Sequence, residues 1–223
     1  NYILKNNFKK WGLKKRFLFK KKCDQTVNDL GSKKFVKILN HLTKNKGLFL
    51  DTDLDGGGFH KVLDGGYLNV HVDFTSHYKN QNWKRVLNLL MYFNRDWKKS
   101  YNGYLEFYDK KGISNKVSIE PKFNRCVIFN TNETSFHGHP EGLKLPKNVS
   151  RNSFAVYYYI ETKKFQKSKA TYYRPKKDVN IFYNLVVKFE NFLLNLYLIL
   201  KRNKILNDDK ITTILNIIKL FST

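Results

Sequence analysis

The sequence predicts a mainly β fold of the sandwich or jelly-roll type, with flanking helices and a C-terminal helical extension. Between residues 47 and 160, short apolar runs follow one another at close spacing, separated by Gly, Asn and Asp turns, which is typical of such folds. The segments on either side instead show the helical period. A chain of 223 residues is long enough for one domain with an appendage. We therefore expect a basic N-terminal segment with a support helix (residues 1–45), the β domain (46–165) and the helical extension (166–223).

The chain is strongly basic, with 42 Lys and Arg residues against 18 Asp and Glu residues and a formal net charge of +24. A charge of this size is typical of proteins that bind nucleic acid or an anionic surface. Here the lysines are spread over every expected element instead of following one stripe. Because evenly spread charge specifies no partner, we favour biased composition as its origin and keep nucleic-acid binding as the alternative.

The two cysteines, Cys23 and Cys126, lie far apart and form neither a CxxC motif nor a disulfide framework. Cys126 opens an apolar run, so we expect a small core residue there. The absence of a disulfide framework fits a reducing compartment, and we therefore expect a cytoplasmic location.

Two features are expected before the β domain. Residues 1–22 alternate lysines with aromatic side chains. They form either a basic amphipathic stretch that touches a membrane or nucleic acid, or a solvated arm whose aromatics pack on the domain, and we favour the arm. Downstream, Ser32 can cap a helix that runs to about Lys44. The apolar positions of this helix recur at i, i+3, i+4 and i+7 and should form one buried face, made of Phe35, Ile38, Leu39 and Leu42.

The expected strands of the β domain are separated by turns rich in glycine and asparagine. Residues 56–58 are all glycine and predict a tight loop or a close backbone approach, while the lack of a following GK[ST] motif excludes a phosphate loop. Residues 64–66 predict a turn between two strands. Strands are expected at residues 47–50, 59–62, 67–73, 85–93, 103–108, 116–119, 125–130 and 153–160, the fourth of them apolar enough to be buried on both faces.

The C-terminal part differs in composition. Residues 172–177 resemble a linker, and two helical segments are expected after it, at about residues 179–201 and 208–221. The first of these contains Lys188 and Glu190, so a membrane span is disfavoured. We expect a helical hairpin that packs on the domain or on a second subunit, with peripheral membrane contact by the C-terminal helices as the alternative.

The candidate site begins with His71 and Asp73 at the end of an expected strand. Residues two apart in a strand face the same side, so both side chains can point into one cavity. An imidazole and a carboxylate supply two thirds of the 2-His-1-carboxylate triad, which holds Fe(II) on one face and leaves the other positions open. The pattern is short and also occurs by chance at surface strand ends, so its value depends on a third ligand downstream.

Two histidines, His137 and His139, compete for the third position. Both follow the expected core strand 125–130. His137 comes directly after that strand and its turn, while His139 lies between Gly138 and Pro140, where the chain turns away. We therefore predict His137 as the ligand and place His139 beside it or in the loop.

Arg151 and Ser153 open the last expected strand and face the same side of it. An arginine buried beside a metal needs an anionic partner, because an unpaired guanidinium is costly there. A dicarboxylate fits this requirement: two of its oxygens can chelate the metal while its far carboxylate meets the planar guanidinium fork. The Ser153 hydroxyl can add a further donor.

In this order, the pieces resemble a known family, the Fe(II)- and 2-oxoglutarate-dependent dioxygenases of the prolyl 4-hydroxylase-like type. The resemblance covers roughly half of the chain and implies a double-stranded β-helix (jelly roll) with supporting helices on one side. Residues 166–223 have no counterpart in the shared core of that family, and the loop between His137 and Arg151 is somewhat long for the prolyl hydroxylase group. Besides these site residues, the resemblance is carried by residues 56–60, 65–74, 85–94, 97, 103–106 and 135–140.

The resemblance implies three iron ligands, namely His71, Asp73 and His137. It also implies that Arg151 binds the distal carboxylate of 2-oxoglutarate. Tyr92 matches a tyrosine that often hydrogen-bonds the same cosubstrate, and Ser153 can assist. We expect His139 and Asn69 to lie beside the ligands without binding the metal.

The implied chemistry is hydroxylation of an unactivated C–H bond with O₂, coupled to decarboxylation of 2-oxoglutarate to succinate, with Fe(II) as the metal and ascorbate as a candidate reductant. Peptidyl proline or a small molecule is the favoured substrate. The alternatives are a hydroxylase of a small molecule or sugar, an oxidative demethylase of nucleic acids, and a non-catalytic binding barrel. The complete ligand set argues against a non-catalytic barrel. The demethylase branch usually carries a longer arginine-rich signature than residues 151–153.

Overall fold

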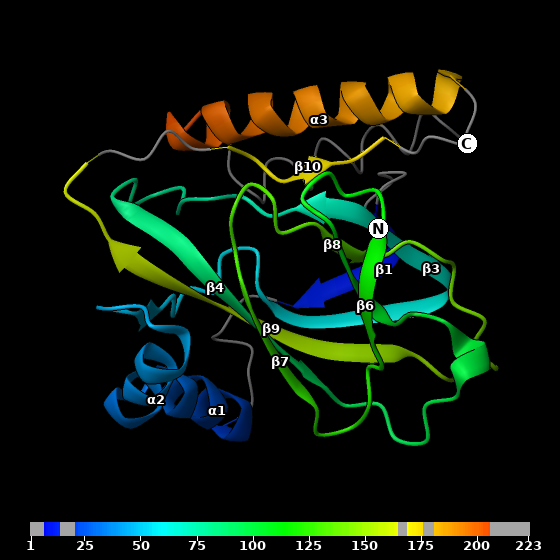
Figure 1. Cartoon of the computed structure of the whole chain (residues 1–223), viewed down its shortest axis with the longest axis horizontal. Coiled ribbons are helices and arrows are strands. Elements are labelled where there is room, and N and C mark those ends of the chain that lie inside the picture. The colour runs from blue at the N-terminus through cyan, green and yellow to red at the C-terminus, as the bar shows by residue number, and fades with distance from the viewer. Residues whose placement is uncertain (1–6, 14–20, 165–168, 176–180, 206–223) are drawn as a thin grey trace.

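The computed structural model describes residues 7–13, 21–164, 169–175 and 181–205, and it confirms a mainly β fold with flanking helices (Figure 1). The helices are α1 (Lys21–Gly31), α2 (Lys33–Thr43), the short 3₁₀ helix η2 (Lys99–Tyr101) and α3 (Ile181–Arg202). The strands are β1 (Asn7–Leu13), β2 (Phe49–Leu50), β3 (Gly58–Val72), β4 (Trp83–Tyr92), β5 (Leu105–Tyr108), β6 (Asn115–Ile119), β7 (Cys126–Asn130), β8 (His137–His139), β9 (Arg151–Glu161) and β10 (Tyr172–Tyr173).

Strands β3 to β9 form two antiparallel layers that share the long strand β3. The first half of β3 pairs with β9, which continues to β4 and β7. The second half pairs with β8, which continues to β5 and β6. The layers pack face to face, since Tyr92 of β4 and Val127 of β7 share a core cluster with Leu105 of β5. Two layers connected in this order form the double-stranded β-helix, or jelly roll, that the sequence predicts.

The predicted turn at residues 64–66 is wrong, because β3 runs through it without a break. Gly65 has a positive φ of 71°, which a glycine adopts at no steric cost. Its N–H donates to the carbonyl oxygen of Leu143, and the Leu143 N–H donates to the carbonyl of Gly66. The loop after β8 therefore supplies hydrogen-bond partners for Gly65 and Gly66, where a turn was expected. With these partners, β3 continues from one layer into the other.

The predicted helix after Ser32 is confirmed as α2. The Ser32 hydroxyl accepts a hydrogen bond from the Phe35 N–H, as an N-cap does. The expected buried face is only partly right, because Leu39 is 1% exposed whereas Ile38 is 46% and Leu42 is 68% exposed. The helix α2 therefore contacts the sheet through a narrower face than its periodicity indicates.

The helix α1, which was not expected from the sequence, accounts for this narrower face. Its residues Val27 and Leu30 are buried in the same core cluster as Leu39. The hydroxyl of Tyr158 on β9 donates to the carbonyl oxygen of Leu30, which ties α1 to the sheet. The apolar surface at this side of the sheet is thus divided between two helices.

The expectation that Cys126 is a core residue is wrong. Cys126 is the first residue of β7 and is exposed, whereas its neighbour Val127 is buried. Successive residues of a strand face opposite sides, so only one of the two can point into the core. Both Cys23 and Cys126 are free thiols.

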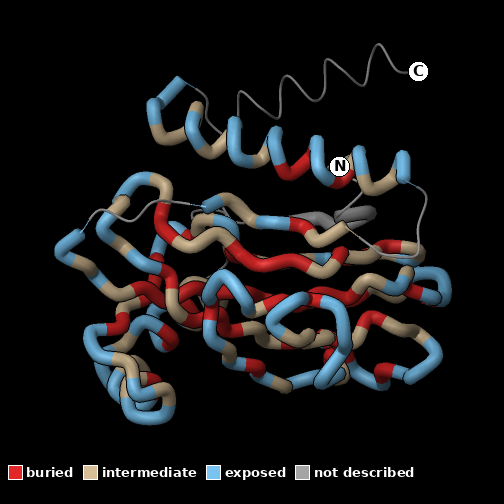
Figure 2. Tube along the Cα trace, turned by 45° about the horizontal axis from the view of Figure 1, so that its top comes forward, coloured by how far each residue is buried: buried red, intermediate tan, exposed pale blue. Residues whose placement is uncertain are grey.

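The C-terminal part folds onto the barrel. Residues 172–173 form β10, which pairs with β3, instead of lying in a free linker. The first predicted C-terminal helix is confirmed as α3, which lies beyond β10 along one side of the barrel with its outward side exposed (Figures 1 and 2). None of the described helices is both long and apolar enough to cross a bilayer. The second predicted helix, at residues 208–221, lies outside the described residues, as does most of the N-terminal segment apart from β1.

Candidate metal and cosubstrate site

Two strands of one layer bring the predicted ligands together. His71 and Asp73 lie at the end of β3, and His137 opens the neighbouring strand β8, where it pairs in register with His71. All three side chains are buried, at 5%, 8% and 5% exposure. One donor atom from each lies within 4.8 Å of the other two, and no other described residues form such a group. The structure therefore gathers the three residues that the sequence singled out.

Both imidazoles are oriented so that their Nε2 atoms could bind a cation. Nδ1 of His71 lies 2.8 Å from the carbonyl oxygen of Asn69, and Nδ1 of His137 lies 2.9 Å from that of Ser135. A carbonyl oxygen only accepts, so each Nδ1 carries the hydrogen and, in a neutral ring, each Nε2 presents a lone pair. The two Nε2 atoms lie 3.6 and 3.5 Å from the carboxylate oxygens of Asp73. Lone pairs and negative charge converge on one point, as a 2-His-1-carboxylate site for a metal ion such as Fe(II) requires.

The surroundings of His137 and Asp73 keep both side chains in the protonation states that bind a metal ion. Burial lowers the pKa of His137 to about 4, although the Asp73 carboxylate opposes this effect. Burial alone would raise the pKa of Asp73, but the Arg85 guanidinium, with His137 and His71, holds it well below its usual range. At neutral pH, His137 is therefore neutral and Asp73 ionised, which are the states in which both bind metals.

Arg85 is a site residue that sequence reasoning missed. It lies on β4 with 1% exposure, its Nη2 donates to Oδ2 of Asp73 at 3.0 Å, and its guanidinium stacks 3.3 Å from the centre of the Tyr157 ring. A basic residue at the start of an apolar strand is the only signal in the sequence, and it does not distinguish a buried arginine from an exposed one. The contact arises only in the fold, where the segment that follows β3 runs beside β4 and the Arg85 N–H donates to the Thr75 carbonyl oxygen.

His139 and Asn69 lie beside the ligands, as expected. His139 is 3% exposed and lines the same cavity, but it is not among the three converging donors. Between the two histidines, Gly138 has no room for a side chain, because a Cβ atom there would lie 2.8 Å from the carbonyl oxygen of Leu68. This close backbone approach brings β8 against β3. The side-chain amide of Asn69 donates to the Tyr183 hydroxyl on α3.

The predicted cosubstrate residues gather at the start of β9. Arg151 is 5% exposed and Ser153 is 4% exposed, and both line the cavity. Arg151 Nε donates to the carbonyl oxygen of Gly103 at 2.8 Å, and its Nη2 donates to the Tyr92 hydroxyl at 3.3 Å. Among the described residues, no carboxylate forms an ion pair with this guanidinium. A buried, uncompensated cation in a cavity favours an anionic ligand.

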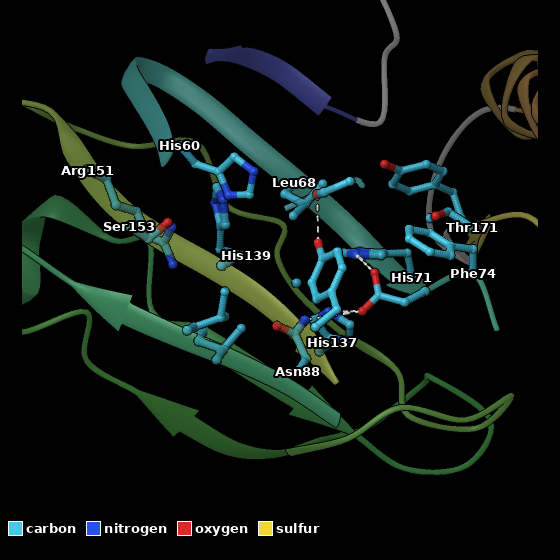
Figure 3. A pocket seen from close by; sticks show the side chains of 18 residues that line it. His60, Leu68, His71, Phe74, Asn88, His137, His139, Arg151, Ser153 and Thr171 are labelled. Carbon is cyan, nitrogen blue, oxygen red and sulfur yellow. Dashed lines mark hydrogen bonds and ion pairs between the residues drawn. The ribbon is translucent and has the colours of Figure 1, made fainter. Parts of the chain in front are cut away.

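One cavity of about 210 Å³ connects the two groups. Figure 3 shows Arg151 and Ser153 at one end of the cavity and Thr171 with Phe74 at the other, with His71 and His137 between them. A ligand that reaches from Arg151 to the three converging donors would therefore leave the Thr171 end free. This end is formed partly by Thr171 and Tyr173, which follow β9, and Tyr173 belongs to the stretch that the sequence assigned to a linker.

Fold and site together define a jelly-roll protein in which three residues that could hold a metal ion share one cavity with a buried arginine. Residues 57–159 match the family model of the 2OG-Fe(II) oxygenase superfamily. This match covers slightly less than half of the chain and agrees with the family that the motifs resemble. A comparison with curated proteins gave no match.

Solved structures that are similar to the chain include three prolyl hydroxylases. A prolyl hydroxylase from Trichoplax adhaerens, in complex with a hypoxia inducible factor peptide fragment, is 17% identical over 56% of this chain and 55% of its own, with a TM-score of 0.38. A prolyl-4-hydroxylase from Pseudomonas putida is 17% identical over 64% and 66%, with a TM-score of 0.44. The viral collagen prolyl hydroxylase of Paramecium Bursaria Chlorella virus-1 is 12% identical over 68% and 96%, with a TM-score of 0.38. The chain thus spans between about half and two thirds of the length of the first two.

Proposed function

We propose that this protein is an Fe(II)- and 2-oxoglutarate-dependent dioxygenase that hydroxylates an unactivated C–H bond. The observation that carries this proposal is the pairing of two features in one cavity: three converging metal donors, and a buried arginine that has no carboxylate partner among the described residues. A metal site alone would fit many proteins. The arginine adds the requirement for an anion that also reaches the metal, which 2-oxoglutarate meets.

In this proposal His71, Asp73 and His137 hold the iron. When bound, iron supplies the oxidative chemistry, in which O₂ and 2-oxoglutarate yield succinate, CO₂ and a hydroxylated product. The protein orients the ligands: the carbonyl oxygens behind both imidazoles fix the ring orientation. The buried cavity limits the access of water to the reacting groups.

Arg151, Tyr92 and Ser153 would bind the distal carboxylate of 2-oxoglutarate. The planar guanidinium can meet a carboxylate with two parallel hydrogen bonds. Burial raises the pKa of Tyr92, although Arg151 opposes this effect, so the Tyr92 hydroxyl keeps its proton and remains a donor at neutral pH. Ser153 lies two residues from Arg151 on the same face of β9 and can add a third donor.

For the substrate we propose a peptidyl proline, because the sequence motifs resemble the prolyl 4-hydroxylase-like members of the superfamily. A small molecule is the second candidate, since the metal site itself does not distinguish between them. Ascorbate is proposed only as a reductant that keeps the iron in its Fe(II) state. A cytoplasmic location stays a prediction.

The test uses the Fe(II)-loaded full chain with 2-oxoglutarate, ascorbate and a proline-rich peptide. We expect succinate and an equal amount of hydroxyproline in the peptide, measured by mass spectrometry, and neither product from Asp73→Ala. Succinate without peptide hydroxylation would contradict the substrate and retain the reaction class. If neither succinate nor 2-oxoglutarate binding is found, the proposed function is contradicted and a non-catalytic binding barrel becomes the better interpretation. Nucleic-acid binding would instead show a steep salt dependence.

A further inference from the structure

The C-terminal strand β10 lies next to the metal ligands. It pairs antiparallel with the end of β3, with Tyr172 opposite Val72 and Tyr173 opposite His71. Directly opposed residues share a face, so Tyr173 points to the same side as His71. Their ring centres are 5.2 Å apart. Tyr173 is 7% exposed and lines the cavity, whereas Tyr172 faces the other side and is 43% exposed.

The helix α3 holds β10 in this place through one side chain. The Asn191 amide oxygen accepts from the Tyr173 N–H at 2.9 Å, and the amide nitrogen donates to the Tyr173 carbonyl oxygen at 2.7 Å. Asn191 is 7% exposed. These two hydrogen bonds satisfy the outer edge of β10 in the way that a neighbouring strand would. The position of Tyr173 therefore depends on α3.

Further contacts fix α3 and β10 to the barrel around the site. Near the start of α3, the Tyr183 hydroxyl accepts a hydrogen bond from Asn69, the residue whose carbonyl oxygen orients His71. At its end, Lys201 forms a 3.1 Å ion pair with Asp55, in which both side chains are largely buried. On β10, the Arg174 N–H donates to the carbonyl oxygen of Val70. The segment is thus attached on both sides of Tyr173.

We propose that the C-terminal segment completes the active site: β10, held by Asn191 of α3, closes the metal end of the cavity, and Tyr173 determines which molecules reach the metal. The proposal rests on the proposed metal site. It goes beyond that site because the residues come from the part of the chain outside the matched family region. Thr171 marks the same end of the cavity, away from Arg151 (Figure 3).

The position of Tyr173 explains what it would select. The cosubstrate approaches the metal from the Arg151 end, so the substrate must approach from the end that Tyr173 lines. Burial raises the pKa of Tyr173, so its phenol stays neutral and adds no charge beside the ligands. A broad, rigid ring at this point admits small groups and excludes bulky ones.

The test measures access to the metal with two probes of different size in the Co(II)-loaded full chain. Azide is the small probe, and its binding is followed by the absorption spectrum of Co(II). The chelator 4-(2-pyridylazo)resorcinol is the bulky probe, and it reports the rate of Co(II) removal. We expect Tyr173→Ala and Asn191→Ala to lose Co(II) to the chelator on the order of tenfold faster than the wild type, as the loss of two hydrogen bonds or of the ring predicts. Azide affinity should not change.

Matched controls separate this role from general destabilisation. Tyr172→Ala removes a ring from the opposite face of β10, and Asn195→Ala removes an amide one turn further along α3. Both variants should lose Co(II) to the chelator at the wild-type rate. Tyr173→Phe keeps the ring and should lose Co(II) as slowly as the wild type. Asn191→Asp retains the acceptor for the Tyr173 N–H but not the donor, so its rate of Co(II) loss should be intermediate. An unchanged Co(II) spectrum in Asn191→Ala would show that the three ligands remain in place.

The outcomes distinguish this proposal from the proposed function. If the wild type binds Co(II) but Tyr173→Ala and Asn191→Ala lose it as slowly as the wild type, the C-terminal segment does not control access and only this inference is overturned. If Tyr172→Ala accelerates Co(II) removal as much as Tyr173→Ala does, this inference is overturned as well. If the wild type binds no Co(II), the metal site itself is contradicted, and this inference falls with it.

Discussion

The Arg85 guanidinium donates a hydrogen bond of 3.0 Å to Oδ2 of Asp73, and both side chains are buried. The same guanidinium lies between the rings of Phe74 and Tyr157, with its central carbon 4.4 and 3.3 Å from their centres. Arg85 therefore provides the counter-charge for the carboxylate of the triad while no cation is bound. A cation held by the triad would compensate the same carboxylate.

Replacing Arg85 with Met should destabilise the metal-free protein. The substitution leaves the Asp73 carboxylate buried without its counter-charge, which costs on the order of 3–5 kcal/mol of the free energy of unfolding. Because a divalent cation at the triad replaces the missing positive charge, the loss should be smaller with Mn(II) present. Urea denaturation with and without Mn(II) measures both values.

The matched control is Arg125→Met. Arg125 forms a 3.7 Å ion pair with Glu120 nearer the surface, with its side chain 38% exposed. Such pairs contribute at most about 1 kcal/mol, and Arg125 does not line the cavity that holds the triad. A stability loss in Arg85→Met that is as small as in Arg125→Met would contradict the role of Arg85.

Replacing Arg151 with Met should weaken 2-oxoglutarate binding. The buried cation is the only charged partner proposed for the distal carboxylate, so affinity for the Mn(II)-loaded protein should fall on the order of 100-fold. Tyr92→Phe removes one hydroxyl donor and should cost only about 5-fold. Isothermal titration calorimetry measures both affinities, and Arg95→Met, on the exposed turn after β4, serves as the control. Unchanged affinity in Arg151→Met would disprove this assignment.

The stability of the metal-free protein should fall as the solution is acidified. The pKa of His137 is lowered from 6.5 to about 4 in the folded state. Between these values the unfolded chain binds the proton and the folded chain does not, so protonation favours unfolding. Stability is full above about pH 6.5 and is lost toward pH 4, with a total effect on the order of 3 kcal/mol.

The comparison variant for this pH dependence is His137→Phe, which keeps an aromatic ring but cannot titrate. It should show a shallower loss between pH 6.5 and 4. Part of the slope should remain, because burial also lowers the pKa of His77. Asp73, whose pKa is lowered below 3.8, contributes a separate loss at lower pH. Identical slopes in the wild type and the variant would show that His137 is not buried in its neutral form.

Two leucines of α2 test the packing of the support helix. Leu39 is 1% exposed and Leu42 is 68% exposed. Leu39→Ala creates a core cavity and should lower the free energy of unfolding by about 2–5 kcal/mol. Leu42→Ala changes the same residue type on the same helix and should change it by less than about 0.5 kcal/mol. Similar values for the two variants would mean that α2 packs through the wider face that the sequence predicts.

Much of the site was predictable because its residues lie close to strand ends in the sequence. The spacing of His71 and Asp73 alone places both side chains on one face. The choice of His137 over His139 followed from its place directly after a strand, and the structure groups His137 with the other two donors. Arg151 lies in the same cavity, as expected for the residue that opens β9.

The features that the sequence missed or placed wrongly depend on contacts between distant segments. Neither Arg85 nor Tyr173 carries a local signal, because each is defined by a residue of another segment, Asp73 for Arg85 and His71 for Tyr173. Ile38 was assigned to the buried face because a periodic pattern does not show how wide a face the partner covers. The exposure of Cys126 depends on which of two alternating faces the barrel buries, and an apolar run on its own does not decide this.

The central claim is that His71, Asp73 and His137 hold the iron that turns over 2-oxoglutarate. The most direct measurement is succinate formation by the purified full chain with Fe(II), 2-oxoglutarate, ascorbate and O₂, for the wild type, His137→Ala and His139→Ala. We predict succinate from the wild type and from His139→Ala, and none from His137→Ala with its fold confirmed by circular dichroism. Succinate formation by folded His137→Ala at the wild-type rate would contradict the claim.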